Sequence, residues 1–386
     1  MEDYMRQALS VEKGRSRLLR QHVTAFIAIS IAAVLFGGCN QTKGWLYVAN
    51  TAYPQIHIYS VDLGSNNLPQ LQPKPSVTVA AGPPEAIRIV GAMLYMAAGT
   101  GAIAQYAINP NDGGLTLQGT ITTGSPPYAI ASTNKTLYVA NRGSGTMSVF
   151  SINAGGSLAA LQTVGVNDIK TIQVDGSGKF LFAGIGPKGA NGPRICAMAI
   201  QTDGTLAAGP GNCIAVNGSP ESMLYAGNVL YLRIFATTAS GIGNSYRISA
   251  LTVDSITGAL SHRGQELDIG AANSDGLAIS VDGKFLFLSR QGGFLTMSAA
   301  DPLRVVANAT PISGSQWCAW PPVGAGAVLV DPRGKSLYIS DPVSSTLGNI
   351  TGARVSSQAI DGNGALSPIT CDAITGIPIS MAMFIP

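Results

Sequence analysis

Only 11% of the 386 residues carry a charged side chain, against about 25% in ordinary soluble domains. The formal net charge is +3, and neither a basic stripe nor a block of like charges is present, which argues against nucleic acid as a partner. A surface so poor in charge has to be built from Gly, Ser, Thr, Asn and Gln, as in exported all-β proteins with tight turns.

The first residues have the composition of an export signal. Five basic residues come before an uncharged apolar run of 14 residues, Val23 to Phe36, and this run is shorter than the roughly twenty residues of a membrane span. Because Gly37-Gly38-Cys39 follows, the segment resembles a bacterial lipoprotein signal, although Phe36 stands where that motif usually has Leu.

We therefore expect a signal peptide over residues 1–38, a lipid on Cys39 and a short linker over residues 39–44. The mature chain would then be a membrane-anchored lipoprotein of the bacterial cell envelope, on the periplasmic side or the cell surface. An ordinary signal peptide or an uncleaved N-terminal anchor is the alternative.

A short apolar phrase then returns along the rest of the chain. Trp45-Leu46-Tyr47-Val48-Ala49-Asn50 is the first copy, and the central aromatic recurs at intervals of 43 to 56 residues, as Tyr47, Tyr95, Tyr138, Phe182, Tyr231, Phe287 and Tyr338. A period of this size with strand-like content is typical of β-propeller blades. Seven copies predict an all-β protein with seven blades.

The copy from Pro127 to Val164 shows what one blade contains. It has four strand-like segments separated by Gly- and Asn-rich turns, and the segment Met147 to Ile152 alternates in hydrophobicity as a strand does. We expect a four-stranded antiparallel sheet that packs against its neighbours around an axis.

The two ends of the repeat region complement each other. The first copy enters at its second strand, at Trp45, and residues 377–385 look like an innermost strand with nothing after it. Pairing the C-terminal strand into the first blade would close the ring and remove its open edges. Residues 45–386 are therefore expected to form one domain.

Four cysteines follow Cys39, and an even number in an exported chain indicates disulfides. Three pairings are possible. We favour Cys196–Cys213, because these residues lie on consecutive strand candidates, together with Cys318–Cys371. No cysteine or histidine spacing indicates a metal, and we expect no cofactor. Three turn aspartates, Asp175, Asp282 and Asp331, occur at what look like equivalent turns, where they would cap backbone N–H groups.

The segment Leu137 to Ile152, with the Gly-rich turn and Ser157-Leu158 behind it, resembles the repeat of the lactonase-type seven-bladed propellers. That group includes 6-phosphogluconolactonases and is similar to the YVTN-repeat propellers of cell envelopes. Lactonase-type enzymes often have histidine at the start of an innermost strand, and this chain has none there. His57 and His262 are expected to be surface or packing residues, so a histidine general base is excluded.

In a propeller, the starts of the innermost strands and the turns between second and third strands meet at one end of the ring. That end is where we expect a ligand. If the site hydrolyses lactones, Glu85 or Glu221 would activate water and Arg142 or Arg290 would stabilise the oxyanion. Further ligand-binding candidates at this end are Tyr128, Lys170, Arg233, Asp275 and Asp341.

A cytosolic sugar-phosphate lactone would not meet an exported lipoprotein. We therefore favour a module that binds a small ligand or an envelope protein partner, and keep lactone hydrolysis as the alternative.

Overall fold

The structure, a computed structural model, describes residues 44–386 apart from 64–68, 190, 208–210, 238–243, 271–275, 291–292, 302, 310–325, 345–349 and 375. The second of two compact units, Lys43–Pro386, contains all of them. The expected signal peptide, Cys39 and residues 39–43 of the expected linker lie outside the described residues, and the first strand begins at Gly44, one residue before the expected Trp45.

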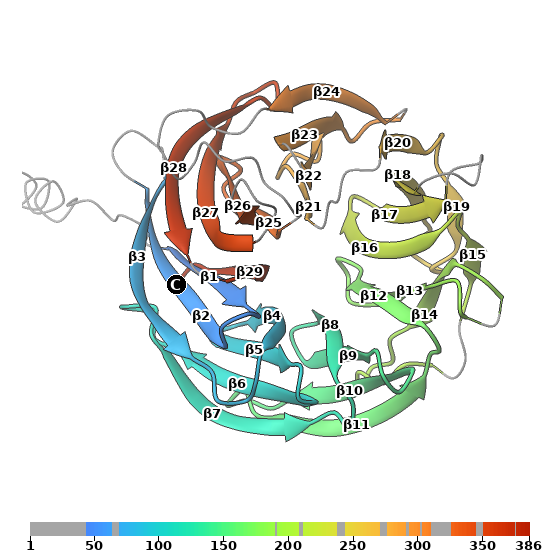
Figure 1. The fold of residues 1–386 in the computed structure, drawn as a ribbon. Helices are drawn as coiled ribbons and strands as arrows, with labels where there is room; N and C mark the ends of the chain where they lie inside the picture. The colour runs from blue at the N-terminus through green and yellow to red at the C-terminus, as the bar shows by residue number, and fades with distance from the viewer. Residues whose placement is uncertain are drawn as a thin grey trace, which may run out of the picture. The chain divides into compact units, whose positions relative to one another are not determined.

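Seven antiparallel sheets follow one another around an axis, which confirms the predicted seven-bladed β-propeller (Figure 1). Each blade is numbered by its place in the ring. Blades 1 to 3 consist of β29 (Pro378–Phe384) with β1 (Gly44–Asn50), β2 (Gln55–Leu63) and β3 (Pro69–Thr78); β4 (Pro84–Val90), β5 (Met93–Ala98), β6 (Ala102–Ile108) and β7 (Leu115–Thr122); and β8 (Pro127–Ser132), β9 (Thr136–Asn141), β10 (Thr146–Ile152) and β11 (Leu158–Gly165).

Blade 5 departs from the four-stranded pattern, because two short strands share its outer edge. Blades 4 to 7 consist of β12 (Ile169–Val174), β13 (Phe180–Ile185), β14 (Arg194–Ala199) and β15 (Cys213–Ala215); β16 (Ser219–Ala226), β17 (Val229–Thr237), β18 (Asn244–Val253), β19 (Leu260–His262) and β20 (Leu267–Gly270); β21 (Leu277–Ile279), β22 (Phe285–Arg290), β23 (Gly293–Ser298) and β24 (Arg304–Ala309); and β25 (Val328–Val330), β26 (Ser336–Ser344), β27 (Ile350–Ile360) and β28 (Leu366–Ile374).

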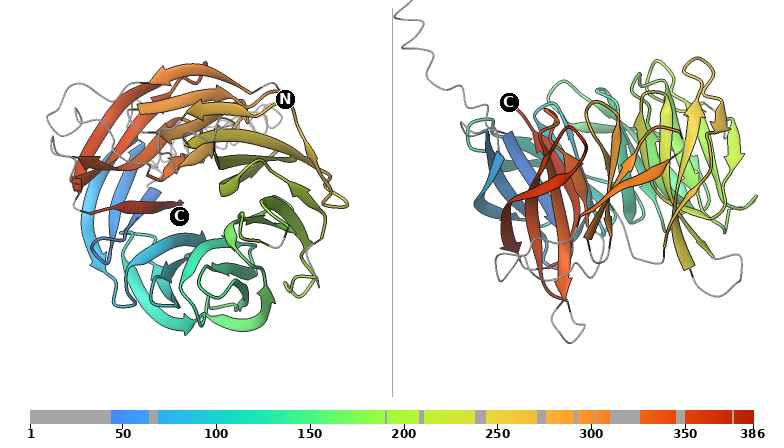
Figure 2. Two further views of the ribbon diagram at one scale, coloured as in Figure 1. Left: turned by 45° about the vertical axis from the view of Figure 1, so that its right-hand side comes forward. Right: turned by 90° about the horizontal axis from the view of Figure 1, so that it is seen from above.

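The C-terminal strand closes the ring as predicted. β29 pairs antiparallel with β1, so that Trp45 lies opposite Phe384 and Val48 opposite Met381. In Figure 1 the two ends of the colour scale, blue β1 and red β29, lie side by side. Because the strands run roughly along the axis of the ring (Figure 2), their ends gather on two opposite faces.

The repeated aromatic explains how neighbouring blades dock. In several blades the tyrosine hydroxyl donates a hydrogen bond to a carbonyl in a turn of the next blade, as from Tyr47 to Gly113, Tyr95 to Gly156, Tyr138 to Gly204 and Tyr231 to Ala299, at 2.7 to 2.9 Å. Tyr47, Tyr95 and Tyr138 are completely buried. The repeated phrase thus supplies both a large buried ring for the core and a hydrogen bond between neighbouring blades.

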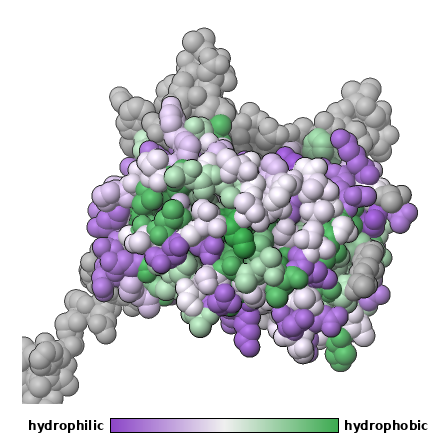
Figure 3. Space-filling view, turned by 90° about the horizontal axis from the view of Figure 1, so that it is seen from below, coloured by the Kyte–Doolittle hydropathy of each residue, from purple (hydrophilic) through white to green (hydrophobic). Residues whose placement is uncertain are grey.

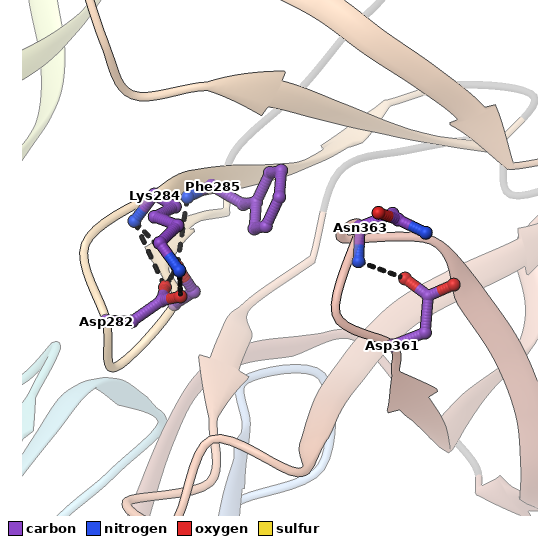
Figure 4. A network of polar contacts seen from close by, with 6 residues as sticks. Asp282, Lys284, Phe285, Asp361 and Asn363 are labelled. Carbon is purple, nitrogen blue, oxygen red and sulfur yellow. Dashed lines mark hydrogen bonds and ion pairs between the residues drawn. The ribbon is translucent and has the colours of Figure 1, made fainter.

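Blade 6 forms an equivalent hydrogen bond to the next blade without a tyrosine. Phe287 has no hydroxyl, and its cross-strand partner Thr296 donates instead to the carbonyl of Gly364, at 3.0 Å. Gly364 has φ +77°, and a Cβ on it would lie 2.7 Å from the ring of Phe285, so glycine is required there. Figure 4 shows this turn, with Asp361 accepting from the N–H of Asn363, beside Phe285.

The turns between first and second strands contain the predicted capping side chains, at two different positions. Asp175 accepts hydrogen bonds from the N–H groups of Lys179 and Phe180, both at 2.8 Å. In blade 6 the residue in the same place is Ser280, whose hydroxyl accepts from the N–H groups of Lys284 and Phe285. Asp282 lies two residues further on and caps Lys284 from there (Figure 4). The capping role and the equivalence of the turns were therefore predicted correctly, although Asp282 and Asp175 occupy different positions within their turns.

One disulfide, Cys196–Cys213, joins β14 to β15, with a Cα–Cα distance of 4.0 Å, which confirms the favoured pairing. Cys371 is also disulfide-bonded, and Cys318, its expected partner, lies outside the described residues.

Candidate binding site at the mouth of the propeller

One face of the ring collects the starts of the innermost strands, and we call this face the mouth. There a backbone N–H near the end of the second strand donates a hydrogen bond to a backbone carbonyl near the start of the innermost strand. The N–H of Gly99 bonds to Pro83, that of Arg142 to Pro126, and that of Gly186 to Asp168, at 2.8 to 3.2 Å. The strand starts and the second turns therefore lie together, as the sequence predicted.

The innermost strands share a feature that sequence reasoning missed. In blades 1 to 5 a β-bulge interrupts the ladder at the second residue of the innermost strand, or at the third in blade 5, so that this residue has no partner on the neighbouring strand. The bulged residues are Ile379 in blade 1 and Glu85, Tyr128, Lys170 and Glu221 in blades 2 to 5. Bulges redirect side chains and are common beside functional sites. The four residues of blades 2 to 5 were site candidates, and all four are half-buried.

A sequence signal for the bulges does exist. In blades 1, 2, 3 and 5 the residue before the bulge is a proline: Pro378, Pro84, Pro127 and Pro220. Proline has no N–H for the ladder and is found in strands mainly at first positions and at bulges. A Pro-X pair at the start of an innermost strand therefore marks X as a side chain turned away from the ladder.

Glu85, Tyr128 and Arg142 are brought together from two adjacent blades. The guanidinium carbon of Arg142 lies 3.8 Å from the centroid of the Tyr128 ring, in cation–π geometry. Burial raises the pKa of the Glu85 carboxyl, and the positive charge of Arg142 opposes that rise. Glu85 and Arg142 form no ion pair within 4.0 Å in the described structure. The two charges thus lie close enough to influence each other without forming a salt bridge.

Lys170 has a carboxylate partner. Its ammonium lies 3.0 Å from Asp168, whose other oxygen accepts the N–H of Lys188 at 2.8 Å. Asp168 has φ +56°, an uncommon conformation for a residue other than glycine. Asp168 therefore holds both Lys170 and the turn after β13 in place.

Glu221 and Arg233 both lie in blade 5, and the structure gives them different surroundings. Arg233 is 4% exposed, and its guanidinium carbon lies 5.0 Å from the centroid of the Tyr246 ring. Tyr246 also packs against Phe235, with ring centroids 5.1 Å apart. Glu221 is half-buried, and among the described residues none forms a hydrogen bond or ion pair with its carboxylate.

Three further candidates cannot be placed at the level of side chains. Asp275 lies outside the described residues, and so do the side chains of Arg290 and Asp341, whose backbones belong to β22 and β26. Elsewhere, His57 lies on β2 with Nε2 3.3 Å from the amide nitrogen of Asn50, a packing position, and burial lowers its pKa.

Within the described ranges, no group of three or more His, Cys, Asp and Glu side chains is arranged to hold a metal ion. The described part of the chain likewise contains no helix with the length and hydropathy of a membrane span.

The fold is similar to that of several solved structures. A candidate 6-phosphogluconolactonase from Bacteroides fragilis is 16% identical, with a TM-score of 0.68 over 90% of this chain and 99% of that one. The periplasmic gluconolactonase of Pseudomonas aeruginosa is 16% identical, with a TM-score of 0.67 over 89% and 100%. A protein from Lactobacillus plantarum is 16% identical, with a TM-score of 0.69 over 89% and 99%.

No protein-family model matches the sequence, and no curated protein matches it either. At 16% identity, the structural similarity concerns the fold. The chain is a seven-bladed β-propeller with the architecture of the lactonase-like propellers.

Proposed function

We propose that the mouth binds a small polyhydroxylated compound of the sugar-acid or sugar-lactone class. The observation that carries this proposal is the series of bulges that presents Glu85, Tyr128, Lys170 and Glu221 on four neighbouring strands. In a chain with so few charged residues, this concentration of charge on one face calls for a polar ligand.

The chemistry of the side chains suits such a compound. The Tyr128 ring offers an apolar face for the C–H groups of a sugar, and the carboxylates of Glu85 and Glu221 can accept hydrogen bonds from hydroxyl groups. The guanidinium of Arg142, stacked on Tyr128, can donate two parallel bonds to a carboxylate or one to a lactone carbonyl.

Lactone hydrolysis is the second candidate, favoured by the raised pKa of Glu85. A carboxylate whose pKa is raised toward neutrality is a better general base. Glu85 would take a proton from water as the water oxygen bonds to the carbonyl carbon. Arg142 would stabilise the resulting oxyanion until the ring C–O bond breaks and the departing oxygen takes up the proton. The name of the similar Pseudomonas protein supports testing lactones even on an exported propeller.

The test combines binding and turnover on the purified protein. We expect calorimetry with gluconate to show binding that weakens about tenfold or more in Arg142→Gln, the loss of one charge-assisted contact. A matched control is Glu266→Gln, which removes a carboxylate paired with Arg247 at the outer edge of blade 5. Unchanged gluconate affinity in Arg142→Gln would refute the binding site.

Turnover of glucono-lactone separates the two candidates. If the second candidate holds, Glu85→Gln reduces the rate about 100-fold, the usual contribution of a general base, and Glu266→Gln leaves it unchanged. A protein that binds gluconate but hydrolyses no lactone would eliminate the enzymatic function and leave the binding function standing.

We also propose that the chain is exported and anchored by a lipid on Cys39, on the basis of the basic, apolar and Gly-Gly-Cys segments at its start. Labelling with a radioactive fatty acid in a bacterial host should mark the wild type and leave Cys39→Ser unlabelled. Equal labelling of the two proteins would contradict the anchor.

A further inference from the structure

The face opposite the mouth contains a hollow of about 680 Å³ between blades 3 and 4. Three turns form its walls, residues 133–136, 175–179 and 201–204, and side chains of Arg88 and Tyr225 complete it. The walls lie at the far ends of the innermost strands, so the hollow is separate from the mouth. A volume of this size is within the range of sites for small organic ligands, about 300 to 1,000 Å³.

Arg88 is an exception in the ring. Its position on the innermost strand, opposite the repeated aromatic, is occupied in the other six blades by Ala131, Gln173, Leu224, Ala278, Leu329 and Ala382. Arg88 is thus the single charged residue among seven equivalents. Packing alone does not require it, since apolar residues and one glutamine fill the same place elsewhere.

The guanidinium of Arg88 is held in place but is not neutralised. Its Nε–H donates to the hydroxyl of Ser132 at 3.0 Å. The four remaining N–H groups have no acceptor among the described residues, and Arg88 is accessible to solvent, although partial burial among the surrounding residues lowers the pKa of its guanidinium. An arginine fixed through Nε presents its two Nη atoms as a fork, the geometry that binds a carboxylate or phosphate.

The charges around Arg88 leave the hollow positive. Lys135 and Lys179 also line it, and neither has a carboxylate within 4.0 Å in the part of the chain that the structure describes. The two acidic residues of the walls are already engaged. Asp175 accepts from the backbone of its own turn, and Asp203 accepts from the N–H and hydroxyl of Thr205.

The equivalent hollow between blades 5 and 6 shows the contrast. There Lys284 occupies the place of Lys179 in its turn, and its ammonium lies 3.0 Å from Asp282. The lysine of blade 6 is therefore neutralised locally, whereas that of blade 4 is not.

The remaining walls suit a sugar. The ring of Tyr225 is stacked on Phe182, with centroids 5.8 Å apart, which fixes the orientation of its plane. Gln173, Gln201 and Asn134 supply amide groups that can donate to and accept from hydroxyls. We infer that this hollow is a second binding site, for an acidic oligosaccharide of two or three residues.

The test is calorimetric titration of the protein with three probes: trigalacturonate, maltotriose as its uncharged counterpart, and inorganic phosphate. We expect trigalacturonate to bind, with affinity at least tenfold above that of the other two. Arg88→Gln and Lys179→Gln should each weaken it about fivefold or more. Glutamine is the residue that the fold already accepts at the equivalent position 173, and Lys179 lies on an exposed turn, so at least one of these variants keeps its fold.

Two controls locate the binding. Lys284→Gln, in the equivalent turn of blade 6, should leave the affinity for trigalacturonate unchanged, and Arg142→Gln shows whether the probe binds at the mouth instead. Loss of trigalacturonate binding in Arg142→Gln but not in the two variants of the hollow would overturn the inference. No binding of trigalacturonate, or equal binding of maltotriose or phosphate, would overturn it as well.

Discussion

Asn50 in blade 1 and Asn141 in blade 3 end the same phrase, Tyr-Val-Ala-Asn, and both are completely buried. The carbonyl oxygen of Asn50 accepts the N–H of Ile377 at 3.0 Å and that of Tyr53 at 3.4 Å. The carbonyl oxygen of Asn141 accepts no hydrogen bond from any described residue. Its amide nitrogen donates to the hydroxyls of Thr146 and Ser148.

The difference comes from one residue on the innermost strand. Asn50 lies opposite Pro378 and Asn141 opposite Pro127, so Ile377 corresponds to Pro126. Proline has no N–H, and the donor that Asn50 uses is therefore missing in blade 3. Asn50 therefore links β1 to the residue before β29, whereas the side chain of Asn141 forms hydrogen bonds, among the described residues, only within its own hairpin. The repeated phrase supplies the asparagine, but the residue beside it on the innermost strand determines which hydrogen bonds the asparagine accepts.

The largest effect is expected from removing the closing strand. A chain that ends at Gly376 loses β29, which leaves the edge of β1 open and removes the N–H of Ile377, one of the two donors to Asn50. We expect no cooperative unfolding transition in circular dichroism. A chain that lacks only Ile385 and Pro386, which lie beyond β29, should melt like the wild type. A sharp melt of the shorter chain would refute the role of ring closure.

The comparison of Asn50 with Asn141 predicts that their alanine variants lose different amounts of stability. Asn50→Ala removes the acceptor of two backbone N–H groups, one of them at the closure, and should lower the free energy of unfolding by about 2 to 3 kcal/mol. Asn141→Ala removes donors to two hydroxyls that can rotate to other partners, and about 1 kcal/mol is expected. Urea denaturation measures both. Equal losses, or a larger one for Asn141, would contradict the comparison.

The ring and its closure could be predicted from the sequence because they depend on spacing. The phrase containing Tyr47 recurs often enough to count the blades, and residues 377–385 were recognisable as an innermost strand without a blade. The disulfide Cys196–Cys213 followed from neighbouring strands in the same way.

The details of the mouth were less accessible. Glu85, Tyr128, Lys170 and Glu221 were chosen because they begin innermost strands, but that each occupies a bulge depends on the register of the ladder. The ion pair of Lys170 with Asp168 and the positive φ at Asp168 are likewise not visible in the composition. The hollow on the opposite face brings together turns of two blades, and no pattern along the chain joins them.

A smaller effect is expected in the turns. Asp175→Ala removes an acceptor of hydrogen bonds from the backbone of Lys179 and Phe180, and about 1 to 2 kcal/mol of stability should be lost. Asp175→Ser introduces the residue that blade 6 has in the same place, Ser280, and should restore at least half of that loss. Urea denaturation of the two variants tests this, and a serine variant no more stable than the alanine variant would contradict it.

The smallest effect concerns Asp282. Hydrogen bonds from Ser280 and Lys284 lower the pKa of its carboxyl from 3.8 to about 2. Since the folded state holds the ionised form more strongly, this stabilisation is present above about pH 4 and disappears as the pH falls through 2. Asp282→Asn should therefore lower the melting temperature slightly at pH 7, by less than Asp175→Ala, because the carboxyl is about half exposed.

The pH dependence supplies the control for that prediction. The difference in melting temperature between Asp282→Asn and the wild type should shrink steadily between pH 4 and pH 2. A difference that stayed constant over this interval would show that the carboxylate charge is not involved.

A crystal structure of the protein grown with gluconate tests the binding function of the mouth most directly. We predict the ligand against the ring of Tyr128, with its carboxylate toward Arg142 and its hydroxyls toward Glu85 or Glu221. Gluconate bound elsewhere on the propeller, with the mouth holding only solvent at saturating concentration, would contradict the account.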